Sequence, residues 1–173
     1  MDDNKNNLSP NSLAFIALAN EYCHAVENVA EYEHDEFVAM MLKLLPRIYI
    51  AASDIKVQQA DDELYIDSSL DEFSYDNVKD NMSRVIGEND IYLEVFMEDM
   101  KYSDTPISSS ISENLADIYQ SLYNFVASVK DSANETANGY IYLCKSDFDT
   151  YWGQTLCNVL RALHSIYYNT QQI

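Results

Sequence analysis

Glycine and proline are scarce in this sequence of 173 residues, which contains three of each. Both residues are concentrated in turns, so their scarcity argues against a turn-rich β-sandwich. The apolar residues, at 47% of the sequence, argue against a disordered polymer. The composition therefore favours long helices, and the length suits a single domain that buries about two-thirds of its unfolded surface.

Cysteine is also rare, and long apolar runs are missing. Cys23, Cys144 and Cys157 are odd in number and include no C-x-x-C pair, so neither a disulfide framework nor a zinc site is indicated. No apolar run approaches the length of a membrane span, and residues 1–7 lack the apolar core of a secretory signal. We therefore expect a soluble cytoplasmic protein whose three thiols are reduced and buried.

Basic residues are few, with 10 lysines and arginines against 29 aspartates and glutamates, and the net charge is −19. The acids are concentrated between residues 54 and 104. Such a chain repels phosphate backbones, so we expect no direct binding to nucleic acid or to an anionic membrane. A basic protein or a divalent cation is compatible with this charge, although solubility alone also accounts for it.

The hydrophobic pattern predicts an all-α protein, a single-domain bundle of five or six helices. The first helix is expected to begin at Ser9-Pro10 and to run to about Glu31. A second helix is expected from Asp35 to about Ala52. Apolar residues cover most of its circumference, so we expect it to be central and largely buried, and Pro46 should kink it.

The remaining chain is expected to alternate helices with polar connections. Residues 91–97 are ambiguous, because their apolar residues alternate as in a strand while Tyr92 and Phe96 are spaced as in a helix; we favour a short helix. Ser110 or Ser112 should cap the clearest helix. The other expected segments are helices at about 74–86 and 112–131, a last helix after 139, a long connection at 54–72, and loops at 103–110 and 132–139. The helical domain spans 9–169, between a disordered tail at 1–8 and a C-terminal tail at 170–173.

Two Glu-x-x-His pairs are the sharpest catalytic pattern, Glu21 with His24 and Glu31 with His34. Carboxylate-bridged di-iron sites use this spacing on bundle helices, and Glu98 or Asp99 could add a ligand from another helix. On a helical wheel, however, the first pair and Glu31 lie roughly opposite the apolar stripe. We therefore interpret them as a charged face in water, and keep a metal-dependent enzyme as the rival hypothesis.

Two other patterns resemble functional sites and fail on inspection. The acidic segment 61–72 is similar to a calcium loop, but Ile66 stands where that loop requires glycine and Tyr65 is a poor ligand. His164 could pair with Cys157 two turns earlier, but no local spacing orients a base against the thiol. Phosphate-binding loops, dinucleotide fingerprints and serine elbows are absent. We assign no catalytic, cofactor-binding or metal-binding residue.

Aromatic residues are plentiful, with 14 tyrosines and one tryptophan. Most tyrosines fall on core faces, and a surplus on one surface would mark a protein interface. Trp152 leads the last apolar stripe, so we expect it at the centre of the bundle. Gly153 is unfavourable inside a helix, and we attribute it to a neighbouring helix packed too closely for a side chain.

Several strings resemble an uncharacterised family of bacterial helical proteins, a domain of unknown function, from about Ala14 to Tyr168. The strings are Leu44-Leu45-Pro46 with Tyr49, Tyr92-Leu93-Glu94-Val95-Phe96, Asp117-Ile118-Tyr119-Gln120, and Tyr151-Trp152-Gly153 followed by Leu160, Leu163 and His164. The resemblance implies a bacterial cytosolic helical domain and brings no activity or cofactor with it.

The sequence therefore leaves the function open, including whether the protein is an enzyme. The best interpretation is a non-enzymatic cytoplasmic interaction or adaptor module, because amphipathic helices and an acidic surface are present without convergent reactive groups. Its partner would be another protein, and a basic one suits the charge. An acidic mimic of nucleic acid is the third hypothesis.

Overall fold

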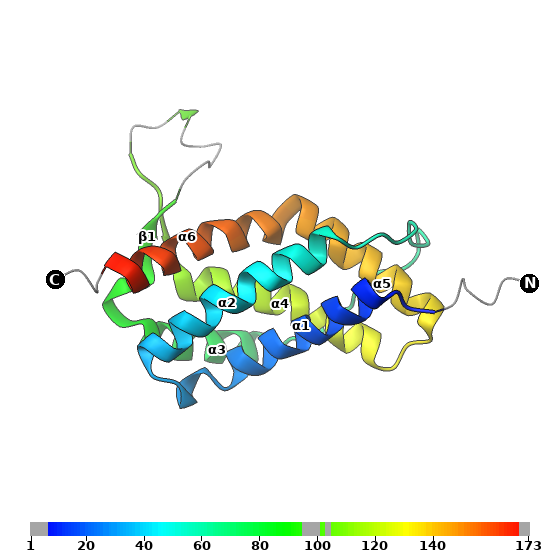
Figure 1. Cartoon of the computed structure of the whole chain (residues 1–173), viewed down its shortest axis with the longest axis horizontal. Coiled ribbons are helices and arrows are strands. Elements are labelled where there is room, and N and C mark those ends of the chain that lie inside the picture. The colour runs from blue at the N-terminus through cyan, green and yellow to red at the C-terminus, as the bar shows by residue number, and fades with distance from the viewer. Residues whose placement is uncertain (1–6, 95–100, 103–104, 170–173) are drawn as a thin grey trace, which may run out of the picture.

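The computed structural model describes residues 7–94, 101–102 and 105–169 of the chain. Six helices make up most of them and pack as one elongated bundle (Figure 1). They are α1 Pro10–Glu27, α2 His34–Ser53, α3 Glu72–Ile86, α4 Ile111–Lys130, α5 Asn134–Asp147 and α6 Gly153–Asn169. The predicted all-α fold is confirmed. The tail predicted at 170–173 and residues 1–6 of the tail predicted at 1–8 lie outside the described residues.

Helix α4 has the central position, because it packs against α1, α3, α5 and α6. Its apolar stripe is buried as expected, and the Ser110 hydroxyl caps it by accepting a hydrogen bond from the Glu113 amide at 3.2 Å. Helix α2 was expected in this position. It continues through Pro46 as one helix and buries one face, but Tyr49 and Ile50 on its other side are 40% and 60% exposed.

A small antiparallel sheet corrects two predictions. The helix expected over residues 91–97 is a strand where it is described, β1 Ile91–Leu93, and residues 95–97 lie outside the described residues. The loop expected over 103–110 ends in a second strand, β2 Ser108–Ser110. Ile91 pairs with Ser110 and Leu93 with Ser108. This pairing joins segments far apart in the chain, so local spacing could not reveal it.

The predicted ends of the first and third helices are nearly right, whereas the predictions for the C-terminal part of the chain need correction. The first helix ends at Glu27, and a 3-10 turn at Val29–Glu31 follows it. Helix α3 begins slightly before the predicted start and ends at Gly87, whose φ of 69° suits glycine. The loop predicted at 132–139 is wrong from Asn134 onward, because α5 begins there. The last predicted helix is two helices, α5 and α6, joined by a π-helical turn at Phe148–Trp152.

The connection from α2 to α3 is extended but anchored. The side-chain oxygen of Asn124 on α4 accepts hydrogen bonds from the backbone amides of Ser69 at 2.9 Å and Leu70 at 2.8 Å. Leu64 packs on Gly139 of α5, where a methyl group would overlap its terminal carbon. The segment therefore lies over α4 and α5 and forms one wall of the site described below.

Trp152 is fully buried, as predicted, between Phe15 at 6.4 Å and Phe148 at 4.7 Å between ring centroids. The explanation offered for Gly153 needs correction. A β-carbon there would lie 2.5 Å from the carbonyl oxygen of Phe148 and 2.8 Å from its ring. The close neighbour is thus the preceding π-helical turn and not another helix.

Within 7–94, 101–102 and 105–169, none of the helices combines the length and the apolar character needed to cross a membrane.

Candidate functional site

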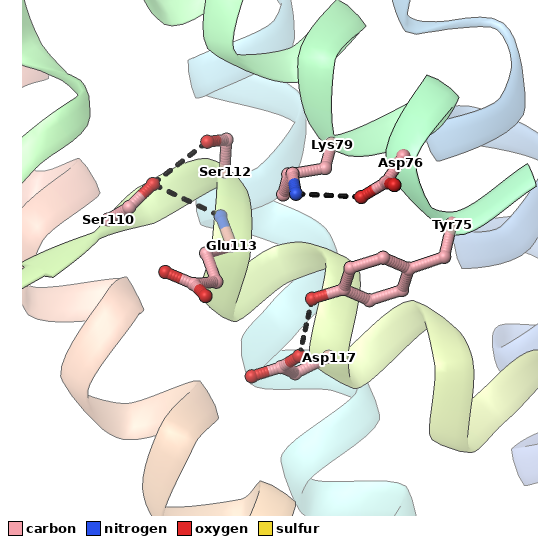
Figure 2. A network of polar contacts seen from close by, with 7 residues as sticks. All are labelled: Tyr75, Asp76, Lys79, Ser110, Ser112, Glu113 and Asp117. Atoms are coloured by element: carbon pink, nitrogen blue, oxygen red, sulfur yellow. Dashed lines mark hydrogen bonds and ion pairs between the residues drawn. The ribbon is translucent and has the colours of Figure 1, made fainter. Parts of the chain in front are cut away.

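Asp117 lies on the side of α4 that faces α3. The hydroxyl of Tyr75, from α3, donates a hydrogen bond of 2.7 Å to its Oδ1 atom (Figure 2). The hydroxyl of Tyr151 donates one of 3.1 Å to its Oδ2 atom. Both carboxylate oxygens are therefore held by a tyrosine, and each keeps lone-pair capacity for a further donor.

The π-helical turn carries Tyr151. Such turns are rare, occur as single bulges in α-helices and are frequent at functional sites. In this turn Tyr151 points to Asp117 while its neighbour Trp152 is fully buried in the core. The turn therefore couples a fixed core residue to a residue of the surface site.

Both tyrosines stay protonated at neutral pH. Burial, with the charge and hydrogen bond of Asp117, raises the pKa of Tyr151 to about 12. Burial and the hydrogen bond to Asp117 likewise raise the pKa of Tyr75. Both hydroxyls are consequently donors to the carboxylate, and neither is an activated nucleophile or base.

Two adjoining hollows lie next to this carboxylate, with volumes of about 480 and 440 Å³. The first contains Asp117 in its wall, and both share Ser68 and Gln120. We call them together the acidic groove. Its lining residues are Leu64, Tyr65, Ile66, Ser68, Leu70, Glu72, Tyr75, Asp76, Asp117, Gln120, Ser121, Asn124, Leu143, Cys144 and Asp147.

The charge of the acidic groove is negative. No lysine or arginine is among the described residues that line it, whereas Glu72, Asp76, Asp117 and Asp147 are. Asp76 accepts a hydrogen bond of 2.8 Å from Lys79, which raises the pKa of that lysine. Asp147 accepts one of 3.1 Å from Ser121.

Glu113 does not line the hollows, but it lies one turn before Asp117 on α4 (Figure 2), and besides burial its charge contributes to the raised pKa of Tyr75. Like charges four residues apart on a helix destabilise it by a few tenths of a kcal/mol. Glu113 and Asp117 thus concentrate negative charge beside the groove at a cost to the stability of α4.

Exposed aromatic rings border the same region. Tyr65 at the wall of the groove is 70% exposed, and Tyr151, which is hydrogen-bonded to Asp117, is 48% exposed. Aromatic faces attract cations, and tyrosine is enriched in protein interfaces. The groove therefore combines carboxylates with rings, the two groups that recognise an ammonium or guanidinium ion.

A buried carboxylate at the start of α4 has a structural role. Asp90 accepts hydrogen bonds from the Ser112 amide and hydroxyl, both at 2.7 Å, and from the hydroxyls of Ser110 at 3.0 Å and Ser83 at 3.1 Å. Ser110 and Ser112 stand at the start of α4 (Figure 2). Asp90 thus completes the cap of this helix.

A second buried carboxylate fixes the small sheet to α6. Glu94 accepts hydrogen bonds from Asn158 of α6 at 2.9 Å and from Tyr92 at 3.0 Å. Arg161, also on α6, donates to the carbonyl oxygen of Leu93 at 2.7 Å. These contacts position β1 against the C-terminal half of the bundle.

Comparison with known proteins identifies the family. A model of the family described as Domain of unknown function (DUF5063) matches residues 6–169. The chain belongs to the DUF5063 family. The resemblance stated from the sequence is confirmed, since that family is an uncharacterised helical domain.

The DUF5063 chain is also similar to a solved structure, that of protein BF1032 from Bacteroides fragilis, a structural genomics target. The two sequences are 29% identical, the match covers 92% of this chain and 94% of the other, and the TM-score is 0.80. No curated protein matches the chain significantly. The comparisons therefore establish the bacterial helical fold and leave the function to the residues.

The Glu-x-x-His residues of this family member do not converge. Glu21 is exposed and accepts a hydrogen bond of 3.0 Å from Arg47, while His24 is exposed and lies 3.1 Å from the side-chain nitrogen of Asn28. Glu31 is exposed in the 3-10 turn, and His34 begins α2 with its Nδ1 atom 2.9 Å from Asp35. In the described part of the chain, no three His, Cys, Asp or Glu side chains are grouped to hold a metal ion. Glu98 and Asp99 lie outside that part.

The other candidate residues are placed as follows. His164 is exposed and lies against Tyr168, with 4.6 Å between ring centroids. Cys157 is exposed, contrary to expectation, whereas Cys23 and Cys144 are buried. Burial raises the pKa of all three thiols, that of Cys23 to about 12, which disfavours the reactive thiolate.

The sequence interpretation missed the acidic groove. It placed Asp117 within the helix expected at 112–131 but did not connect it to Tyr75 or Tyr151. The spacing of Glu113 and Asp117 was the available signal, because two acids on one helix face are unfavourable without a reason outside the helix.

Proposed function

We propose that the protein is a non-enzymatic cytoplasmic adaptor that binds a basic segment of another protein in the acidic groove. The observation that carries this proposal is the Asp117 carboxylate, held by Tyr75 and Tyr151 beside a hollow whose described lining has no lysine or arginine. A lysine or arginine of the partner supplies the missing donor, in a charge-assisted hydrogen bond.

The shape of the groove supports a peptide segment better than a single ion. The two hollows run from the α3 side of Asp117 past Gln120 to Asp147 and Cys144. Leu143 and Ile66 give the second hollow apolar walls. A basic residue near Asp117 followed by an apolar residue in the second hollow matches both parts.

The chemistry of the groove supports binding and gives no support to a reaction. The raised pKa values of Tyr75 and Tyr151 keep both hydroxyls protonated, and the thiol of Cys144 is buried with a raised pKa. A catalytic site would bring a nucleophile together with a base near neutral pH. We therefore favour an adaptor over an enzyme.

The exposed acids of residues 61–72 support a narrower version of the proposal. Asp61, Asp62, Glu63 and Asp67 are exposed along the connection to α3. A row of carboxylates next to the groove would imitate a phosphate backbone for a basic nucleic-acid-binding partner. Replacing these acids by amides should then weaken binding steeply at low salt. An unchanged affinity would reject the nucleic-acid-mimic hypothesis and leave the adaptor proposal standing.

Titration with defined peptides tests the proposal. The probe is a fluorescent peptide that alternates lysine with leucine, and its matched control carries acetyl-lysine, which removes the charge and keeps the shape. The lysine peptide should bind the wild-type protein, with binding that weakens as salt is added. Asp117→Asn should reduce the affinity about tenfold or more, because charge-assisted hydrogen bonds contribute about 1.5–3 kcal/mol.

Asp131→Asn is the control variant, since Asp131 is an exposed acid at the far end of α4 and its change alters the net charge equally. It should leave the affinity nearly unchanged. Equal losses in the two variants would show attraction to the overall charge and not to the groove. Binding of the acetyl-lysine peptide as tight as that of the lysine peptide would also reject the proposal.

A further inference from the structure

An apolar patch with one charged residue at each end occupies the surface where α1 and α2 run side by side. A shallow hollow of about 270 Å³ lies there, lined by Asn11, Ala14, Arg47, Ile50, Ala51 and Asp54. Ile50 is 60% exposed beside it, and Leu13 on α1 is 53% exposed. We call the surface formed by Ala14, Ile50 and Ala51 the α1–α2 patch.

The small number of charged residues sets this surface apart from the rest of the chain, although Arg47 and Asp54 line its hollow. Residues 10–20 of α1 contain no charged side chain, and residues 44–53 of α2 contain only Arg47. The whole chain carries a net charge of −19, so two copies repel each other across most surfaces. The α1–α2 patch is a surface on which two copies can meet without opposing carboxylates.

The patch has a positive charge at one end and a negative charge at the other, so two copies related by a two-fold axis would pair opposite charges. Arg47 and Asp54 lie about two turns apart on the same helix, and the midpoint between them falls between Ile50 and Ala51. A two-fold axis at that midpoint places Arg47 opposite Asp54 of a second copy, and Asp54 opposite Arg47 of that copy. Two-fold interfaces have this property, in which each residue pair occurs twice.

The apolar residues fit the same arrangement. The axis brings Ile50 of each copy to the α1–α2 patch of the other, where Ala14 and Ala51 leave room for it. Arg47 is held in place by its contact with Glu21 at 3.0 Å, and its side chain remains 57% exposed. It is therefore available to a second copy.

We propose that the α1–α2 patch binds a second copy of this chain in an antiparallel, two-fold contact of their α2 helices. This dimer does not depend on the acidic groove. The two proposals differ in their response to salt. Salt screens the repulsion between two negative chains and should strengthen the dimer, whereas it should weaken the binding of a basic peptide.

Sedimentation equilibrium of the full chain over roughly a hundredfold range of concentration tests this proposal. The wild-type protein should show a concentration-dependent dimer that strengthens with added salt. Ile50→Asp should abolish it. The matched control is Ile91→Asp, because Ile91 is also an isoleucine with a similar exposure of 64%, and it lies on β1 outside the patch. That control should dimerise as the wild type does.

A charge exchange tests the two-fold geometry. Asp54→Arg should weaken the dimer, because it places arginines opposite each other, and it should not weaken the fold, since a positive charge is favourable at the end of α2. Adding Arg47→Asp should restore dimerisation by exchanging the two signs. A wild-type protein that is monomeric throughout would overturn the proposal. So would a double variant that stays as weak as Asp54→Arg alone, or dimerisation of Ile50→Asp at wild-type strength.

Discussion

Replacing Gly153 by alanine gives opposite predictions from helix propensity and from this structure. Glycine inside a helix costs about 1 kcal/mol relative to alanine, so propensity predicts a more stable protein. The backbone of Gly153 is helical, with φ −64° and ψ −41°, and accepts alanine without strain. The surroundings of Gly153 leave no room for a methyl group, however. The new β-carbon would lie 2.5 Å from the carbonyl oxygen of Phe148 and 2.8 and 2.9 Å from two of its ring carbons.

The contact with Phe148 cannot be relieved by a simple rotation. Its carbonyl oxygen accepts the hydrogen bond from the Gly153 amide, and its ring packs on Trp152 and on Tyr49. Overpacking of this kind costs about 1–3 kcal/mol, and a backbone contact should fall at the upper end. After the gain in propensity, Gly153→Ala should lower the free energy of unfolding by about 2 kcal/mol, or the melting temperature by roughly 4–8 °C.

Gly139→Ala is the matched control, since Gly139 is also inside a helix and its β-carbon would also overlap a neighbour. That neighbour is the flexible end of Leu64, which can turn aside. The control should therefore be as stable as the wild type or slightly more stable. Urea and thermal unfolding followed by circular dichroism measure both variants. A Gly153→Ala protein at least as stable as Gly139→Ala would refute the steric explanation of the π-helical turn.

Three further predictions follow from the core, the tyrosines and the Glu-x-x-His pairs. Trp152→Ala should cost about 3–5 kcal/mol of unfolding free energy, and the wild-type tryptophan emission should be blue-shifted and poorly quenched; a red-shifted, quenchable emission would place Trp152 at the surface. The pKa of Tyr151 is raised from 10.0 to about 12, so its contribution to stability is complete below pH 10 and is lost as the pH rises through 12. Tyr151→Phe should therefore reduce the loss of stability between those pH values in urea unfolding, and an unchanged loss would contradict the assignment. Protein purified without a histidine tag should contain less than about one-tenth equivalent of iron, manganese or zinc, and a full equivalent would revive the metal hypothesis.

Local patterns were sufficient for most of the helices. The hydrophobic pattern predicted a helix at about 112–131, which is α4, and one of the two serines proposed as its cap, Ser110, is the cap. Both signals depend on residues within a few turns of each other, which sequence spacing captures. The strands β1 and β2 depend instead on pairing across a long segment, and the three serines of β2 carry no strand pattern of their own.

The acidic groove could not be predicted from local patterns either, because its residues are also far apart in the sequence. Tyr75 precedes Asp117 by 42 residues and Tyr151 follows it by 34, so only the packing of three elements brings them together. The π-helical turn that carries Tyr151 was read as part of one continuous helix, because the apolar stripe continues from Phe148 through Trp152 to Leu156. The change in helical phase there depends on contacts in the core, which the spacing of apolar residues does not encode.

Photo-cross-linking in the native bacterium tests the central claim most directly. A benzophenone amino acid replaces Gln120, which is exposed and belongs to both hollows of the acidic groove. The matched position is Asn20, an exposed amide on α1 outside the groove. The account predicts a discrete cross-linked partner at position 120, with a basic segment at the cross-linked site, absent at position 20 and lost when Asp117→Asn is added. A cross-link at position 120 that persists with Asp117→Asn, or none at that position, would show that the acidic groove does not bind a basic partner through Asp117.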